Sequence, residues 1–181
     1  MAITKVTGAL LGNYTGGSAD DTVVVGDGAG DAITTGVDNT LIGDNAGTAL
    51  TEGNDNVAIG NEALAANTTG TGNTAIGTEA LDANTTANFN TAIGSGAATA
   101  NTTGSELVAV GRNALAANTT GSSNTAVGMR ALDVNTTGSY NTSIGADTLG
   151  ANTTGEYNTA LGYRALEDNT TGVRNTGVGR L

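Results

Sequence analysis

Residues 124–140 read NTAVGMRALDVNTTGSY, and residues 141–157 repeat the pattern as NTSIGADTLGANTTGEY. The glycine that closes the first five residues returns every seventeen positions without an insertion. It stands at Gly26, Gly43, Gly60, Gly77, Gly94, Gly111, Gly128, Gly145, Gly162 and Gly179. A short, fixed period places each unit in an equivalent slot along one axis, as in solenoid proteins. The sequence therefore predicts a rod with one 17-residue repeat per coil.

The residue before each of these glycines forms a second series, which we call the Val/Ile ladder. Its members are Val25, Ile42, Ile59, Ile76, Ile93, Val110, Val127, Ile144, Leu161 and Val178. Nine of the ten are β-branched, which is typical of strand residues that stack on their equivalents. Alternation along NTAIG points Ile and Thr to one face of the strand and Asn and Ala to the other. We predict an all-β parallel β-solenoid of the β-roll type, with the Val/Ile ladder as its core.

The second half of each unit carries an Ala-Leu pair, and we expect the leucine to be a second core residue. Full pairs are Ala63/Leu64, Ala80/Leu81, Ala114/Leu115, Ala131/Leu132 and Ala165/Leu166, and weaker forms are Ala97/Ala98 and Thr148/Leu149. The surrounding stretch, as in NEALAAN, contains helix formers and no β-branched residue. It therefore fits either a second strand or a single helical turn per coil.

An asparagine follows each pair and is followed by two threonines. The series is Asn67, Asn84, Asn101, Asn118, Asn135, Asn152 and Asn169, and glycine follows each triplet except at Ala87. Asn and Gly are the usual residues at left-handed turn positions. Stacked amides can also bond to each other along the axis. We therefore predict that these residues form a turn ladder.

The composition predicts a thin core that needs self-association. The 181 residues include one Phe, four Tyr and no Trp, Pro, His or Cys. So few large apolar side chains offset little ordering entropy within one chain. The alanines Ala58, Ala75, Ala92, Ala109, Ala126 and Ala160 form a small-residue stripe opposite the Val/Ile ladder, and a homotrimer is the simplest closed use of it. Without His or Cys the common catalytic triads and most transition-metal sites are unavailable, so we expect neither catalysis nor a cofactor.

The net charge of −11 is unevenly placed. Between Val6 and Val110 there are twelve acidic and no basic residues, whereas five acids and five arginines follow from Gly111 onward. The acidic half argues against nucleic acid or an anionic membrane as a partner. No stretch is long enough for a membrane span, and the N-terminus lacks a signal peptide's apolar region.

The chain divides into three parts by its match to the period. Residues 1–21 do not match and are expected to form an N-terminal cap or attachment segment. Residues 22–55 are diverged first coils, and residues 56–181 are regular repeats. The repeat stops in mid-coil at Leu181, so we expect further chain or another subunit, stacked end to end, to cover the last coil.

The NTAIG and AVG cores with trailing ALxxN and NTTG resemble the head repeats of trimeric autotransporter adhesins, whose coils form parallel β-rolls in homotrimers. Similar repeats occur in bacteriophage tail fibre proteins, and the opening MAITKVTGALLG also resembles the starts of phage fibre and tail proteins. The repeat match covers Thr22 to Leu181. Two departures are the longer period and the missing secretion signal, and the second favours the phage fibre.

The resemblance implies a non-enzymatic structural protein, the shaft or head of a phage tail fibre that takes part in host attachment. Its partners would be further copies of itself, a virion or anchor protein at the N-terminal end, and a host-cell surface receptor, and its location would be the virion. The alternative is a bacterial surface adhesin fragment or extracellular filament subunit at the cell surface. A third class is an ice-binding solenoid, because the paired threonines form a regular array.

Two groups of side chains are candidate sites. Tyr140, Tyr157, Tyr163, Arg130 and Arg164 are the large amphipathic residues of the C-terminal half, and they form our candidate contact surface because Tyr and Arg are common interface anchors. The stretch from Gly26 to Asp31 resembles part of a calcium-binding β-roll repeat, with Asp27 and Asp31 as oxygen ligands. It occurs once and at the wrong period, which favours a solvated acidic loop.

Overall fold

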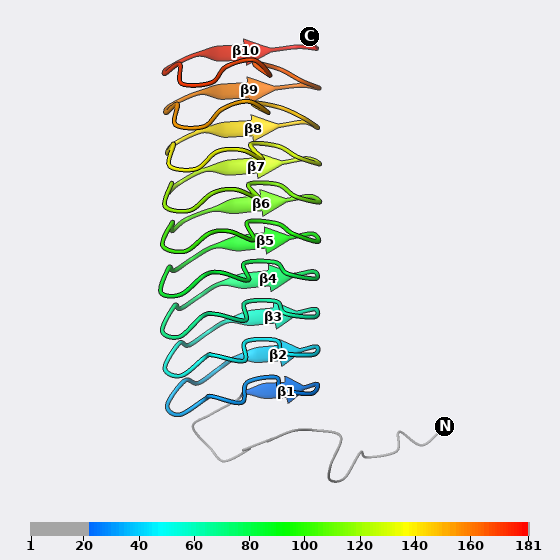
Figure 1. Cartoon of the computed structure of the whole chain (residues 1–181), viewed down its shortest axis with the longest axis vertical. Helices are drawn as coiled ribbons and strands as arrows, with labels where there is room; N and C mark the ends of the chain where they lie inside the picture. The colour runs from blue at the N-terminus through cyan, green and yellow to red at the C-terminus, as the bar shows by residue number, and fades with distance from the viewer. Residues whose placement is uncertain (1–21, 181) are drawn as a thin grey trace, which may run out of the picture.

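The computed structural model describes residues 22–180, which form one rod of stacked coils (Figure 1). Each coil contributes one three-residue strand, and the strands pair in chain order as one parallel sheet. They are β1 (Val23–Val25), β2 (Thr40–Ile42), β3 (Val57–Ile59), β4 (Thr74–Ile76), β5 (Thr91–Ile93), β6 (Val108–Val110), β7 (Thr125–Val127), β8 (Thr142–Ile144), β9 (Thr159–Leu161) and β10 (Thr176–Val178). Ile76 pairs with Ile59 on one side and Ile93 on the other. The predicted solenoid and its period are confirmed.

The diverged first coils and the regular repeats share this sheet. Strand β1 pairs with β2, and β2 pairs with β3, at the same spacing of seventeen residues. The divergence of residues 22–55 is therefore a difference in side chains within one continuous register. The predicted attachment segment, residues 1–21, lies outside the described residues.

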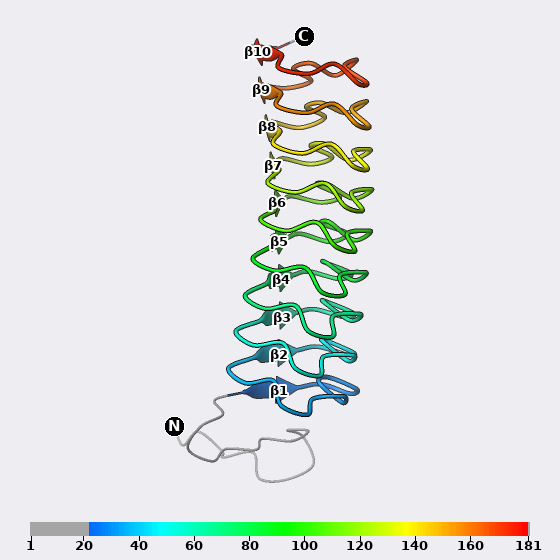
Figure 2. The same cartoon turned by 90° about the vertical axis from the view of Figure 1, so that its left-hand side faces the viewer.

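Backbone pairing between coils continues beyond the strands. In the strand half, Thr40 donates its N–H to the carbonyl of Asn56, and Gly43 donates to that of Val25, both at 2.8 Å. In the return half, which lies to one side of the strands in Figure 2, Leu64 N–H donates to the carbonyl of Ala80 at 2.9 Å. In a helical turn, these N–H groups would instead donate to carbonyl groups of their own coil. The alternative of a helical turn per coil is therefore wrong for the described residues, which contain no helix.

Left-handed backbone conformation falls on leucines of the return segment, for which the sequence predicted burial but not a left-handed turn. Leu64 has φ 56° and Leu81 has φ 52°, whereas none of the asparagines of the turn ladder has a positive φ. A leucine in this conformation costs about 1–2 kcal/mol. Both leucines are fully buried, and burying a leucine side chain contributes about 2 kcal/mol. Burial of the leucine side chains therefore offsets the backbone strain. The turn-ladder asparagines do not adopt the left-handed conformation, so that part of the prediction is wrong.

The central residue of each strand, not the Val/Ile ladder, faces the interior. Ala58, Ala75 and Ala92 are fully buried, whereas Ile93 is 38%, Leu161 46% and Val178 73% exposed. None of the ten members, Val25, Ile42, Ile59, Ile76, Ile93, Val110, Val127, Ile144, Leu161 and Val178, is buried. The alternation along NTAIG was correct, but the predicted core face was wrong. The alanine stripe lies inside each coil, and the Val/Ile ladder runs along its outside.

The physical reason is the width of the coil. Ala75 and Leu81, both fully buried, occupy the places that Leu41 and Gly47 take two coils earlier. Where the strand centre is the large Leu41, the return segment thus has glycine instead of leucine. A Cβ added to Gly47 would lie 2.9 Å from Cδ2 of Leu41. Atoms this close cannot be accommodated without a shift, because interiors are already close-packed. Of the two facing positions in each of these coils, only one can hold a large apolar side chain, so the residues of the Val/Ile ladder point outward.

Two asparagine ladders fill the rest of the interior. In the predicted turn ladder, Asn84 Nδ2 donates to Asn67 Oδ1 at 3.0 Å, and the bond recurs from coil to coil. The second ladder uses the first residue of each NTAIG, where Asn73 N–H donates to Asn56 Oδ1 at 3.0 Å. Its side chain also donates to the carbonyl of Ala87 at 2.9 Å. Amide bonding along the axis is confirmed, and these bonds satisfy polar groups that would be costly to bury unpaired.

Candidate contact surface

The turns before β8 and β9 carry a stacked pair of aromatic rings. Tyr140 precedes β8 and Tyr157 precedes β9 at the same place in successive coils. Their ring centroids are 4.9 Å apart with an angle of 5° between the planes, and the side chains are 54% and 47% exposed. The separation matches the spacing of adjacent strands, about 4.8 Å. The register of the solenoid therefore builds the stack.

A guanidinium extends this stack by one coil. Arg174 occupies the same place before β10, and its Cζ lies 5.3 Å from the Tyr157 ring centroid. Tyr140 covers the other face of that ring, so Tyr157 is held between an aromatic ring and a cation. This geometry is a cation–π contact, worth about 0.5–1 kcal/mol at an exposed site.

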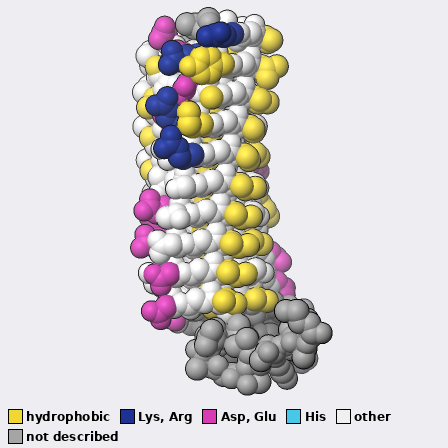
Figure 3. Space-filling model, turned by 90° about the vertical axis from the view of Figure 1, so that its right-hand side faces the viewer, with side chains coloured by type: hydrophobic (Ala, Val, Ile, Leu, Met, Phe, Trp, Pro, Cys, Tyr) yellow, Lys and Arg dark blue, Asp and Glu magenta, His cyan; other side chains and the backbone are white. Residues whose placement is uncertain are grey.

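The remaining candidate residues lie at the opposite end of the strands. Tyr163 and Arg164 follow β9, and Arg130 follows β7. The Cζ of Arg164 lies 5.2 Å and that of Arg180 5.6 Å from the Tyr163 ring centroid. Figure 3 shows this edge, at the carboxyl ends of the strands, with arginines gathered in the C-terminal half. The predicted surface is therefore divided between two edges, Tyr140 and Tyr157 on one and Tyr163, Arg130 and Arg164 on the other.

An ion network joins three coils on the arginine edge. Arg130 Nε donates to Asp147 Oδ1 at 2.8 Å, and Arg164 Nε lies 3.9 Å from Asp147 Oδ2 and 3.5 Å from Glu167 Oε1. Arg164 Nε makes no hydrogen bond, so its contacts are electrostatic. The Asp147 side chain is only 11% exposed, whereas both arginines are almost half exposed. Asp147 lies seventeen residues from each arginine, so the period was the signal that could have identified it as their neighbour.

Acidic side chains dominate the N-terminal half of the same edge (Figure 3). Burial raises the pKa of Asp82, and the nearby carboxylates of Glu62 and Glu79 raise it further. Burial also raises the pKa of Asp133, although Arg130 acts in the opposite direction. The edge is thus negative near the first coils and carries most of its positive charge near the last ones.

The Val/Ile ladder forms an apolar column along the outside of the ten-stranded sheet. Figure 3 shows it as the column of hydrophobic side chains along one side of the rod. Thr74 and its equivalents share this face, because they lie two residues before the ladder on the same strands. The sequence identified the residues but assigned them to the core. In soluble proteins, continuous exposed apolar surface is typical of association sites.

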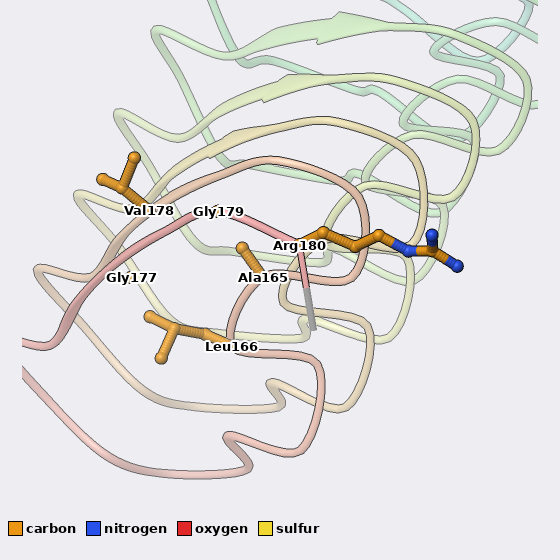
Figure 4. Close-up of a pocket in the computed structure, with 6 residues that line it drawn as sticks. All are labelled: Ala165, Leu166, Gly177, Val178, Gly179 and Arg180. Carbon is orange, nitrogen blue, oxygen red and sulfur yellow. The ribbon is translucent and has the colours of Figure 1, made fainter.

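A pocket opens at the last described coil (Figure 4). Its lining comes from the last return segment and from β10 and the residues after it, namely Ala165, Leu166, Gly177, Val178, Gly179 and Arg180. Leu166 points into the coil beside Gly177, whereas Val178 points away on the other side of the strand. The pocket therefore exposes Leu166, whose equivalents in the preceding coils are buried in the interior.

Residues 22–180 contain no group of three or more His, Cys, Asp or Glu side chains placed to hold a metal ion. The calcium interpretation of Asp27 and Asp31 thus gains no support. The same residues include no helix that is long and apolar enough to cross a bilayer. Comparison with protein-family models, curated proteins and solved structures found no match to this chain.

Proposed function

We propose that this chain is a structural segment of a fibre, built by association of parallel copies along the Val/Ile ladder. The observation that carries the proposal is the unbroken apolar column on the outside of a ten-stranded sheet. Burial of this column between copies would stabilise the assembly, because removing apolar surface from water is favourable. Three copies around one axis would cover all three columns at once, in a closed symmetric assembly.

The resemblance to fibre repeats supports a bacteriophage tail fibre as the structure that contains this assembly. A bacteriophage tail fibre needs a stiff rod, and backbone pairing along the axis on both halves of each coil supports that role. In this proposal the N-terminal end attaches to the virion, and the other end is presented to a receptor on the host cell. The work is mechanical, and no reaction is assigned to it.

The mass of the protein in solution tests the association. Light scattering should give about 52 kDa over a wide range of concentrations, three times the 17.5 kDa chain. The double variant Ile76→Ser/Ile93→Ser should lower that mass, because serine removes apolar surface from two adjacent coils. Its matched control is Ala83→Ser/Ala100→Ser, on the return segment of the same two coils. A monomer at every concentration, or equal masses for the two variants, would contradict the proposal.

The pocket at the last described coil favours a second candidate, a filament of copies stacked end to end. A coil of another copy paired with β10 would cover Leu166 and the free strand edge. Negative-stain microscopy separates the two, because stacking gives rods longer than one chain. A rod of ten coils at about 4.8 Å measures about 40 to 50 Å.

A further inference from the structure

We propose that the free face of the Tyr140 ring, with Ser123 and the carboxylate of Glu106, binds a guanidinium or ammonium group of a protein partner. Glu106, Ser123, Tyr140 and Tyr157 occupy the same place in successive coils, before β6, β7, β8 and β9. The site therefore lies on the edge that carries the tyrosine stack. It belongs to one chain and does not depend on the association proposed above.

The first argument is that one face of the stack is already occupied by a cation. Tyr157 receives the Arg174 guanidinium at 5.3 Å on the face that Tyr140 leaves free. At the other end of the stack, the coil below Tyr140 carries Ser123, whose side chain is too short to cover an aromatic ring. The slot next to Tyr140 thus lacks the long side chain that fills the equivalent slot next to Tyr157.

The second argument is the charge beneath this slot. Ser123 Oγ donates to Glu106 Oε2 at 3.0 Å, which places the carboxylate one coil below the ring. Glu106 is exposed, and no Lys or Arg of the described residues lies within ion-pair distance of it. A cation in the slot would therefore contact the ring face and the carboxylate together. Aromatic faces and carboxylates both attract cations.

The charge of the chain favours a cation over a neutral ligand. All twelve charged residues between Val6 and Val110 are acidic, so the potential below Tyr140 is negative. A pyranose ring can also stack on a tyrosine, but its hydroxyl groups would gain nothing from this potential. We therefore assign the site to a basic side chain and treat sugar binding as an outcome of the test.

The experiment is an NMR titration of the full chain with labelled tyrosine rings, in which Tyr140→Phe identifies the Tyr140 signals. The probe is N-acetyl-arginine methylamide, and N-acetyl-citrulline methylamide is its neutral control. We expect the arginine probe to shift the Tyr140 signals, and the citrulline probe to leave them almost unchanged. Glu106→Gln should weaken binding about two- to fivefold, as expected for loss of one exposed ion pair.

A second variant tests the site by filling it from within the chain. Ser123→Arg should place a guanidinium on Tyr140, as Arg174 does on Tyr157, and abolish the response to the probe. Ser95→Arg adds the same charge on the other edge and should leave the response intact. Equal shifts with citrulline, a response to methyl glucoside instead of arginine, or shifts confined to Tyr157 or Tyr163 would each overturn the proposal.

Discussion

A Cβ added to Gly94 would lie 2.6 Å from the carbonyl oxygen of Gly111 in the next coil. Gly94 also has φ 135°, a conformation that side chains disfavour. The same two restrictions hold at the equivalent glycine of each coil from Gly26 to Gly162. This close approach explains why the repeat has glycine after every strand.

Gly94→Ala should therefore lower the free energy of unfolding by at least about 2 kcal/mol, because it combines backbone strain with a backbone clash. Urea unfolding followed by circular dichroism measures the loss. Ser95→Ala, at the exposed neighbouring position, should change stability by less than about 0.5 kcal/mol. Similar losses for the two variants would show that the approach between coils is not the cause.

Exchange of side-chain volume across one coil should be tolerated, whereas either half of the exchange should not. Ala75→Leu overfills the interior and should cost about 1–3 kcal/mol. Leu81→Gly empties it, and removal of a buried leucine side chain costs about 2–5 kcal/mol. The double variant copies the coil of Leu41 and Gly47, so it should recover most of the loss in urea unfolding.

The control for this exchange separates the two changes. Ala75→Leu combined with Leu115→Gly, two coils away, should show additive losses because these residues share no contact. Additive losses for the first pair as well would contradict the packing of Ala75 against Leu81.

Leu107 interrupts the second asparagine ladder, and its replacement by asparagine should change the free energy of unfolding little. The N–H of Leu107 donates to Asn90 Oδ1 at 2.9 Å, but its side chain donates no amide bond. The N–H of Asn124 therefore lacks the side-chain acceptor that Asn141 N–H finds in Asn124 Oδ1 at 2.9 Å. Leu107→Asn would restore these bonds at about 1 kcal/mol each, against about 2 kcal/mol of lost apolar burial. We expect a net change within about 1 kcal/mol. Asn141→Leu should cost about 2–4 kcal/mol, since it leaves buried polar groups unpaired. Calorimetric unfolding measures both variants, and equal losses of stability would contradict a stabilising role of the second asparagine ladder.

The raised pKa of Asp82 predicts a pH dependence of stability. Between the ordinary value of 3.8 and the raised value, the folded chain holds a proton that the unfolded chain has lost. The contribution of Asp82 to stability therefore falls as pH rises through this window and stays low above it. Asp82→Asn should be more stable than the native chain at pH 7, and the difference should disappear at low pH. Asp168→Asn, an equal charge change at an exposed position, serves as the control in thermal unfolding.

The Asp147 network should respond to salt. Asp147→Asn leaves Arg130 and Arg164 facing each other without the carboxylate, while asparagine tolerates the φ of 56° at this position. We expect a loss of about 0.5–1 kcal/mol at low ionic strength and a smaller loss in 1 M NaCl, because these arginines are partly exposed. A loss that is independent of salt in urea unfolding would exclude an electrostatic cause.

The sequence by itself determined the repeat, the parallel register and the amide bonding. A period of seventeen without insertions places Ile76 beside Ile93 and Asn84 beside Asn67, whatever the cross-section of the coil. The burial of Leu81 was also predictable, since leucine is the largest apolar residue of the return segment. These features depend on spacing and residue type alone.

Only the tertiary structure decided which face of the strand is buried. Alternation gives two faces, and hydrophobicity favoured the one with Ile76, but the interior beside Leu81 has room only for Ala75. The pairing of Leu41 with Gly47, and of Val24 with Gly30, was a signal in the sequence that could have shown this. The distance across a coil depends on how the return segment folds back, and the left-handed leucines that shape it follow no local sequence rule.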